Sequence, residues 1–303
     1  ISWFLSSMAS VPAVIQSYKR FDIIHCHTFP FALGGRIVSL WSSVPIVVTV
    51  HSSHFLRLSK KAFMRPALRF LLSSASVVLS TSEEIDKVVR ELLPGAETIA
   101  IVNGVDTSFF KPSAPYLERK PGVFDILCPR RLVEKNGVEF LIRALNLLKE
   151  KLDFHAYIAG DGPLRKRLED MVREFDIVER VTFLGSVENY KMPGVYSSSD
   201  LVVIPSLVEA TSIAALEAMS CGKVVAASSV GGLPEIIDEK TGILFEPGSP
   251  QAIANAILKA ATQLNLDDMG RLARERVEAT WSIAKIAEMH EEIYERIRRK
   301  SGD

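Results

Sequence analysis

The sequence lacks an excess of either charge, because 36 lysine and arginine residues are balanced by 36 aspartate and glutamate residues. A nucleic-acid-binding domain usually carries a clear basic excess, so the balance predicts no nucleic-acid partner. No apolar run reaches the roughly 18 residues that a membrane-spanning helix requires. The chain nevertheless has 303 residues, of which 48% are hydrophobic, which is enough for two separate cores. These features favour a globular protein of two domains.

Cysteine is also scarce. The three cysteines, Cys26, Cys128 and Cys221, each lie in or beside an apolar run and show no metal-ligand spacing. An odd number cannot all pair within the chain. We therefore predict buried free thiols in a reducing compartment, which makes the expected location the cytoplasm.

Acidic residues are absent between Asp22 and Glu83. The basic residues of this segment are Arg36, Arg57, Lys60, Lys61, Arg65 and Arg69. Four of them recur at every fourth position from Arg57 to Arg69, so on a helix they would form one stripe unless Pro66 breaks it. This pattern predicts a peripheral contact with an anionic membrane, on its inner face, where a lipid-linked acceptor would wait. A solvated helix face or an anionic soluble acceptor are the alternatives.

Short β-branched runs recur along the chain, and helical patterns separate most of them. The runs are FDIIHCH, VPIVVTVH, ASVVLSTS, ETIAIV, VFDILCP, DFHAYIAG, RVTFLG, DLVVIPS, KVVAASS and GILFEP. Because they lack polar alternation, they are typical of parallel strands covered on both faces. The sequence therefore predicts an α/β fold of two doubly wound domains.

A stretch with three prolines and no helical or strand period separates the two groups of strands. We predict a first domain over residues 1–106, a linker over 107–122, a second domain over 123–280, and a final helix over 281–303 that packs back on the first domain. The first domain shows four strands, whereas a doubly wound half usually has more. We therefore expect this domain to be incomplete, so that the chain binds its donor but turns it over poorly.

Polar residues follow several of the predicted strands. Ligands bind at the carboxyl ends of the strands in such sheets, so these residues are candidates for a site. They are His25, His27, His51, His54, Arg130, Arg131, Glu209 and the glycines of AGDGP and VGGLPE. A zinc pair would fit the spacing of His25 and His27, but no third ligand is apparent and we predict no metal. All of these residues would meet at one cleft if the two sheets face each other.

Two carboxylates, Glu209 and Glu217, lie eight positions apart in an apolar stretch. Inside one helix they would be about 12 Å apart and would not touch. If a helix begins near Thr211 or Ser212, Glu209 lies in the loop before it and Glu217 lies in its second turn. That arrangement suits a long ligand bracketed by the two carboxylates.

Six segments in order resemble the motif series of a known enzyme family. They are NGVDTSFFKP, RRLVEKNG, AGDGPL, VTFLGSV, PSLVEATSIAALEAMSCGKVV, and VGGLPEII with TGILFEPG. The series is similar to that of the retaining GT-B glycosyltransferases of family 4. The resemblance implies two Rossmann-like domains facing a cleft and transfer of a hexose from a UDP-, GDP- or ADP-sugar. The acceptor would be a hydroxyl of a glycan, a lipid or a small molecule, and no metal or cofactor would be obligatory.

The resemblance also implies roles for individual residues. Glu209 would touch the transferred sugar beside its anomeric carbon, His51 would line the sugar pocket, and Glu217 would hold the ribose hydroxyls. The donor diphosphate would meet Arg131, Lys135 and the helix start at Thr211, Ser212 and Ile213, whose free N–H groups favour an anion. The nucleotide-sugar pocket would include Gly160, Asp161, Gly162, Gly231 and Gly232.

The chain departs from the family pattern at two places. Ala210, Thr211 and Ser212 stand where the family has glycine, phenylalanine or proline, then glycine, and Lys135 precedes Asn136 where many relatives place the lysine one position later. Two other readings remain open. One is a sugar-nucleotide epimerase of the same fold, and the other is a catalytically silent subunit that binds a sugar nucleotide.

Overall fold

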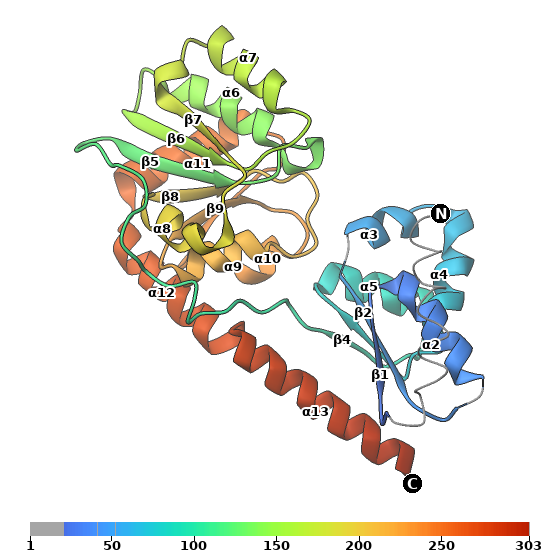
Figure 1. Cartoon of the computed structure of the whole chain (residues 1–303). Coiled ribbons are helices and arrows are strands. Elements are labelled where there is room, and N and C mark those ends of the chain that lie inside the picture. Colours follow the sequence, from blue (N-terminus) through green and yellow to red (C-terminus); the bar gives the residue numbers. More distant parts are fainter. Residues whose placement is uncertain (1–20, 41, 52, 303) are drawn as a thin grey trace. The chain divides into compact units, whose positions relative to one another are not determined.

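The computed structural model describes residues 21–40, 42–51 and 53–302. They form two compact units, one of residues up to Asn103 together with those from Ile286 onward, and one of Gly104–Lys285. Each unit is built on one parallel sheet (Figure 1). All ten runs predicted as strands are strands, and every strand pairing is parallel, so the predicted doubly wound α/β architecture is confirmed.

The first unit contains a sheet in the order β1-β2-β3-β4. Its strands are β1 (Ile24–His27), β2 (Ile46–Val50), β3 (Val77–Ser80) and β4 (Thr98–Ala100). Its helices are α2 (Ala32–Ser39), α3 (Ser53–Ser59), α4 (Arg65–Leu72) and α5 (Glu83–Leu92), with short 3-10 turns at Phe29–Phe31 and Ala62–Met64. Ser82 caps α5 by accepting from the N–H of Ile85 at 3.3 Å, which leaves the acidic first turn at the positive end of the helix.

The basic stripe expected from Arg57 to Arg69 does not lie on one helix. Arg57 belongs to α3, which ends at Ser59, and Lys61 has an extended backbone before α4 begins at Arg65. Pro66 lies in the first turn of α4, where proline is well tolerated because its missing N–H would have had no helical partner. The prediction of a single helical stripe is therefore wrong, because the proline starts a new helix.

The last helix, α13 (Ile283–Gly302), supplies part of the first unit's core. Ile293 and Ile297 of α13 are buried against Val47 of β2 and against Val77 and Leu79 of β3. Arg296 and Lys300 also pair with Glu97 at 2.5 and 3.0 Å. The end of the chain thus packs on the first sheet through apolar contacts and through charges at the rim.

The second unit contains a sheet in the order β10-β9-β8-β5-β6-β7. The strands are β5 (Phe124–Pro129), β6 (Phe154–Ala159), β7 (Val181–Gly185), β8 (Leu201–Ile204), β9 (Val224–Ser228) and β10 (Gly242–Phe245). The helices are α6 (Val138–Leu148), α7 (Arg165–Glu174), α8 (Met192–Ser197), α9 (Ile213–Ser220), α10 (Leu233–Ile236), α11 (Pro250–Gln263) and α12 (Leu266–Thr280). Short 3-10 turns lie at Glu134–Asn136, Val178–Arg180 and Asn189–Lys191.

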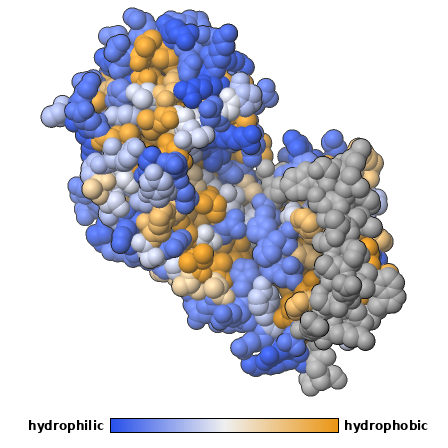
Figure 2. All heavy atoms as spheres, viewed as in Figure 1, coloured by the Kyte–Doolittle hydropathy of each residue, from blue (hydrophilic) through white to orange (hydrophobic). Residues whose placement is uncertain are grey.

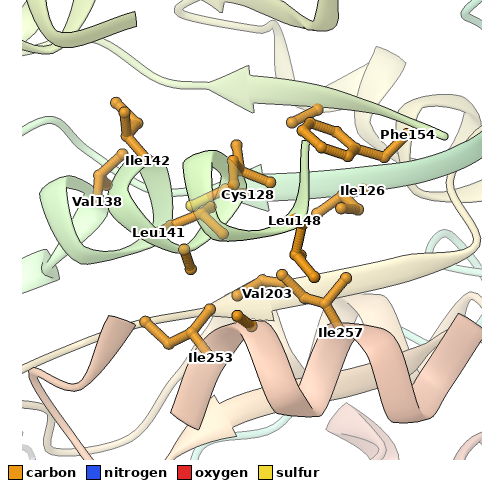
Figure 3. Packing of buried hydrophobic residues seen from close by; sticks show 14 of the residues in the cluster. Ile126, Cys128, Val138, Leu141, Ile142, Leu148, Phe154, Val203, Ile253 and Ile257 are labelled. Atoms are coloured by element: carbon orange, nitrogen blue, oxygen red, sulfur yellow. The ribbon is translucent and has the colours of Figure 1, made fainter. Parts of the chain in front are cut away.

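The core of the second unit packs α6 and α11 on the sheet. Figure 3 shows Leu141 of α6 and Ile257 of α11 beside Ile126 of β5 and Val203 of β8, and all four are fully buried. On the face in Figure 2, hydrophilic residues surround separate hydrophobic patches on this unit, as is usual for a globular domain in water. The packed sheet gives the loops at its carboxyl edge a fixed base.

Residues 107–122, the segment predicted to be a linker, contain no helix or strand and are attached to the second unit. Ser220 Oγ donates to the carbonyl of Phe110 at 2.5 Å. Farther along, the Tyr116 N–H donates to Ser198 Oγ at 2.9 Å. The segment is therefore hydrogen-bonded to α9 and to the end of α8 rather than exposed along its whole length.

Candidate functional site

The topology of the second unit points to one edge of its sheet. The chain fills the order β5, β6, β7 in one direction and then β8, β9, β10 in the other, so the direction reverses between β5 and β8. Ligands of open α/β sheets bind at such a switch point, outside the carboxyl ends of the strands. Arg130 and Arg131 follow β5 there, and Glu209 follows β8. The fold therefore brings together three residues that the sequence placed at strand ends.

Arg130 and Glu209 form an ion pair at this switch point. Their side chains are only 10% and 11% exposed. The same guanidinium nitrogen, Nη2, also donates to Ser206 Oγ at 2.6 Å and to Asn136 Oδ1 at 3.0 Å. Removing one partner of such a buried pair typically costs about 3–5 kcal/mol, so the pair holds the two loops together.

Helix α9 begins beside this ion pair. Its first residue is Ile213, and Ser212 caps it by accepting from the N–H of Ala215 at 3.4 Å. The predicted helix start is confirmed, with Glu209 in the preceding loop and Glu217 in the second turn. The first N–H groups of the helix have no partner inside it, so its mouth carries partial positive charge.

Glu217 lies at the other end of the candidate site. Its Oε2 accepts a hydrogen bond of 2.8 Å from the hydroxyl of Tyr196, which comes from α8. Burial raises the pKa of Glu217 above its usual range, and the Tyr196 hydrogen bond opposes that shift. Burial, followed by the negative charge of Glu217, also raises the pKa of Tyr196, so this hydroxyl stays a donor. Tyr196 thereby fixes the orientation of the carboxylate.

A cavity of about 340 Å³ lies along this edge. Its lining includes Arg130, Arg131, Gly160, Asp161, Tyr196 and Glu217. The sequence assigned a role to four of these residues but not to Arg130 or Tyr196. Arg130 had been noted at a strand end but given no role, and nothing in the sequence pattern indicated Tyr196.

Two of the predicted cations differ in position. Both Arg131 and Lys135 are exposed, but only Arg131 lines the cavity. The carbonyl of Lys135 accepts from the N–H of Leu207 at 2.8 Å, which ties the turn after β5 to the loop after β8. The structure thus places the Lys135 backbone next to the site and its side chain outside the cavity lining.

The predicted glycines let the loops of the site approach one another. Gly231 has φ +55°, and a Cβ there would lie 2.0 Å from the carbonyl oxygen of Glu209. Gly160, with φ +148°, lies as close to the backbone of Arg130, where a Cβ would be 2.2 Å from the carbonyl oxygen. Gly162 packs on Leu132 in the same way. Only glycine fits these contacts, which set the positions of Arg130 and Glu209.

Gly232 and Thr211 complete the predicted set on this unit. The N–H of Gly232 donates to the carbonyl of Ala210 at 2.9 Å, so the loop before α10 is joined to the loop before α9. Thr211 is partly buried in that second loop. Both residues therefore lie next to Glu209 and the start of α9, although neither lines the cavity.

The predicted histidines gather at the carboxyl edge of the first unit's sheet. His25 and His27 stack at 4.1 Å between ring centroids, and His27 Nδ1 lies 3.2 Å from Nε2 of His51. His25 Nδ1 is 2.5 Å from the hydroxyl of Tyr294, and its Nε2 is 2.6 Å from the hydroxyl of Thr49. The rings therefore satisfy one another or nearby hydroxyls.

These histidines are neutral at neutral pH. Burial and the neighbouring imidazoles lower the pKa of His25 to about 3. Burial also lowers the pKa of His27 and His51, although Asn103 partly offsets the shift at His51. Among residues 21–40, 42–51 and 53–302, no group of three or more histidine, cysteine, aspartate or glutamate side chains is placed to hold a metal ion.

All three cysteines are buried and free, as predicted. Burial raises the pKa of both Cys128 and Cys221 to about 12, so these thiols stay protonated and unreactive. Within the described part of the chain, no helix is long and apolar enough to cross a membrane.

Comparison with known proteins identifies the class of this fold and site. Residues 123–263 match the family described as glycosyl transferases group 1, and residues 1–109 match glycosyltransferase family 4. Together these matches cover most of the chain. The chain therefore belongs to the group 1, family 4 glycosyltransferases, and its two Rossmann-like sheets are those of the GT-B fold.

Curated relatives include an uncharacterized glycosyltransferase of Methanocaldococcus jannaschii, 34% identical over 257 residues, which cover 79% of this chain and 66% of that protein. The N-acetyl-alpha-D-glucosaminyl L-malate synthase of Bacillus anthracis is 26% identical over 299 residues, 95% of this chain and 78% of that protein. The chain thus spans about two thirds to three quarters of the length of these relatives.

Two solved structures share the fold. Sucrose-phosphate synthase from Thermosynechococcus elongatus aligns with a TM-score of 0.82 and 25% identity, covering 95% of this chain and 78% of that chain. Anabaena HepE in complex with UDP aligns with a TM-score of 0.81 and 24% identity, covering 93% of this chain and 81% of that chain.

Proposed function

We propose that this protein is a retaining glycosyltransferase that moves a hexose from a nucleoside diphosphate sugar to an acceptor hydroxyl. The observation that carries the proposal is the cavity at the β5–β8 switch point, with Glu217 and Arg131 in its lining and the N-terminus of α9 beside it. A nucleoside diphosphate needs hydrogen-bond acceptors for its ribose and positive charge for its phosphates. This edge of the second unit supplies both.

In this proposal each part of the donor meets a different group. Glu217, held by Tyr196, accepts hydrogen bonds from the ribose hydroxyls. Arg131 and the free N–H groups at the start of α9 receive the diphosphate, and each charge-assisted contact contributes about 1.5–3 kcal/mol. Glu209 lies on the sugar side of the site. The leaving group is already an anion, so the positive charge at this edge stabilises its departure without an obligatory metal.

For the chemical step we propose attack from the face that the diphosphate leaves. The acceptor oxygen forms a bond to the anomeric carbon as the bond to the phosphate oxygen breaks. The acceptor proton passes to the departing phosphate, and the anomeric configuration is retained. Nuclear magnetic resonance of the first product would show the configuration directly, and turnover in the presence of EDTA would test metal independence.

Donor binding is the first test. Thermal denaturation should be followed with UDP-, GDP- and ADP-sugars, beginning with UDP because HepE was solved with it. A donor at 100 times its Kd adds about 2.7 kcal/mol of stability. Release of free nucleotide only when acceptor is present supports transfer. Release without acceptor, with an altered sugar, indicates the epimerase, and binding with no release under any condition indicates a silent subunit.

We also propose a peripheral contact of the first unit with an anionic membrane. Phe63 is 76% exposed and follows the exposed Lys61 closely in sequence, whereas Arg65 is partly buried and pairs with Glu91 at 3.7 Å. Each basic residue near an anionic surface contributes about 1 kcal/mol. Sedimentation with anionic vesicles at low salt should recover the protein, and Phe63→Ala should reduce recovery. Equal recovery with neutral vesicles would contradict the proposal.

A further inference from the structure

Arg130 is the cation most deeply placed at the candidate site. It leaves β5 at its carboxyl end and turns toward the loop after β8. Its side chain is 10% exposed, whereas Arg131 and Lys135 are exposed residues. Its Nη2 contacts Ser206, Asn136 and Glu209. The guanidinium is thus held in place by one of its three nitrogens.

The other two guanidinium nitrogens of Arg130, Nε and Nη1, have N–H groups that lack a close acceptor. In the part of the chain that the structure describes, buried Nε has no hydrogen-bond partner. Nη1 makes only one long contact, 3.5 Å to Ser212 Oγ. A buried donor is seldom left without an acceptor, because desolvating it without a hydrogen bond costs stability. These donors are therefore suited to an acceptor that arrives with a ligand.

The surroundings of Arg130 favour an anion as that acceptor. Glu209 offsets one positive charge, but the N-terminus of α9 begins next to Ser212 and adds partial positive charge. Arg131 adds a full charge at the lining of the same cavity. A phosphate group offers several oxygens to a planar guanidinium with free N–H groups, which is the geometry that arginine binds best.

We infer that Arg130 binds the donor phosphate nearest to the transferred sugar and at the same time positions Glu209. The inference rests on the proposed function, and it assigns to Arg130 the role that the sequence assigned to Lys135. Nη2 holds the Glu209 carboxylate, while Nε and Nη1 donate to the phosphate. One side chain then fixes the distance between the leaving phosphate and the carboxylate beside the sugar.

The test uses titration calorimetry with the whole chain to compare the affinity for a nucleoside diphosphate with the affinity for the matching monophosphate. The first pair is UDP and UMP, and the guanosine and adenosine pairs follow. The unmodified protein should prefer the diphosphate. Arg130→Gln should weaken diphosphate binding by about tenfold or more, which corresponds to about 1.4 kcal/mol. Monophosphate binding should change by less than about threefold, because its phosphate occupies the position farther from Glu209. A merely structural role would lower both affinities together.

Two further variants keep the outcome interpretable. Arg143→Gln removes an exposed arginine of α6 that pairs with Glu139, and it should leave both affinities unchanged. Arg130→Lys keeps a charge opposite Glu209 but loses the fork of N–H groups, so it should fold and still lose part of the diphosphate preference. If either Arg130 variant folds and retains the full preference, the inference is wrong. If the unmodified protein binds none of the nucleotides, the proposed function fails and the inference falls with it.

Discussion

At the carboxyl ends of its strands the first unit carries histidines, whereas the second carries arginines and glutamates. His25, His27 and His51 are neutral because burial lowers their pKa values, and they contact one another or uncharged hydroxyls. In the second unit Arg130 and Glu209 are charged and paired, and the start of a helix lies beside them. The same parallel α/β scaffold thus presents an uncharged edge in one unit and a charged edge in the other.

This difference separates two properties that can be measured independently. Affinity for a diphosphate should depend on the charged edge of the second unit, because arginines and a helix N-terminus meet a cavity there. The pH dependence of stability below neutrality should depend on the buried histidines of the first unit, because burial lowers their pKa values, that of His25 to about 3.

The largest effect is expected from Gly231→Ala. A left-handed backbone costs a non-glycine residue about 1–2 kcal/mol, and the new Cβ would lie 2.0 Å from the Glu209 carbonyl oxygen. Forced overpacking adds about 1–3 kcal/mol, so urea denaturation should show a loss of about 3 kcal/mol. The matched control is Gly95→Ala in the first unit, where φ is +87° but nothing lies within 4 Å, and only the backbone cost applies. Equal losses would show that the loop contact at Gly231 relaxes freely.

The second prediction concerns Glu209. Glu209→Gln should lower kcat by about 100-fold, because a neutral amide cannot stabilise charge that develops at the anomeric carbon. Donor KM should change little, since Arg130 and the start of α9 remain. Steady-state kinetics with saturating acceptor measures both constants. A change confined to KM would contradict the role given to this carboxylate.

The third prediction concerns the other carboxylate of the pair. Glu217→Gln should raise donor KM by about tenfold with kcat nearly unchanged, because a charged acceptor of the ribose hydroxyls is lost. Tyr196→Phe should raise KM less, since it removes only the hydroxyl that orients Glu217. The control is Glu139→Gln on α6, whose carboxylate pairs with Arg143 outside the cavity. If Glu217→Gln behaves like Glu139→Gln, the ribose contact lies elsewhere.

Much of the fold could be predicted from sequence because its strands are short β-branched runs without polar alternation. The helix at the site was predictable for a local reason as well, since Ser212 is a good cap and α9 starts directly after it. The basic stripe does not form because α3 ends at Ser59 and a new helix, with Pro66 in its first turn, begins at Arg65, so the break that Pro66 made possible is present. Local signals were sufficient wherever the structure depends on neighbours in sequence.

The part of the site that could not be predicted depends on contacts between distant segments. Arg130 and Arg131 are adjacent and chemically identical, and the sequence does not show which turns inward at the end of β5. Arg130 does so because Ser206 and Glu209 lie in the loop that follows β8. Strand β8 is the neighbour of β5 in the sheet, although the two strands are far apart in sequence. Tyr196 is similar, because its hydroxyl reaches Glu217 only once α8 and α9 pack together. Such choices follow from tertiary packing and not from spacing.

The smallest effect is expected from the histidines of the first unit. The pKa of His25 is about 3 in the folded protein, whereas an unfolded histidine titrates near 6.5. The unfolded chain therefore binds a proton first, so stability is complete above about pH 6.5 and is lost as the pH falls toward about 3. The charges of His27, His290 and His51 add to the shift.

Urea midpoints measured from pH 7 to pH 5 should therefore decline, and His25→Gln should make the decline shallower. The control is His155→Gln in the second unit, where burial also lowers the histidine pKa but the charge of Asp125 opposes the shift. This variant should change the slope less than His25→Gln does. An unchanged slope in His25→Gln would mean that the imidazole accepts its proton without unfolding, and that the uncharged edge of the first unit is not maintained by burial.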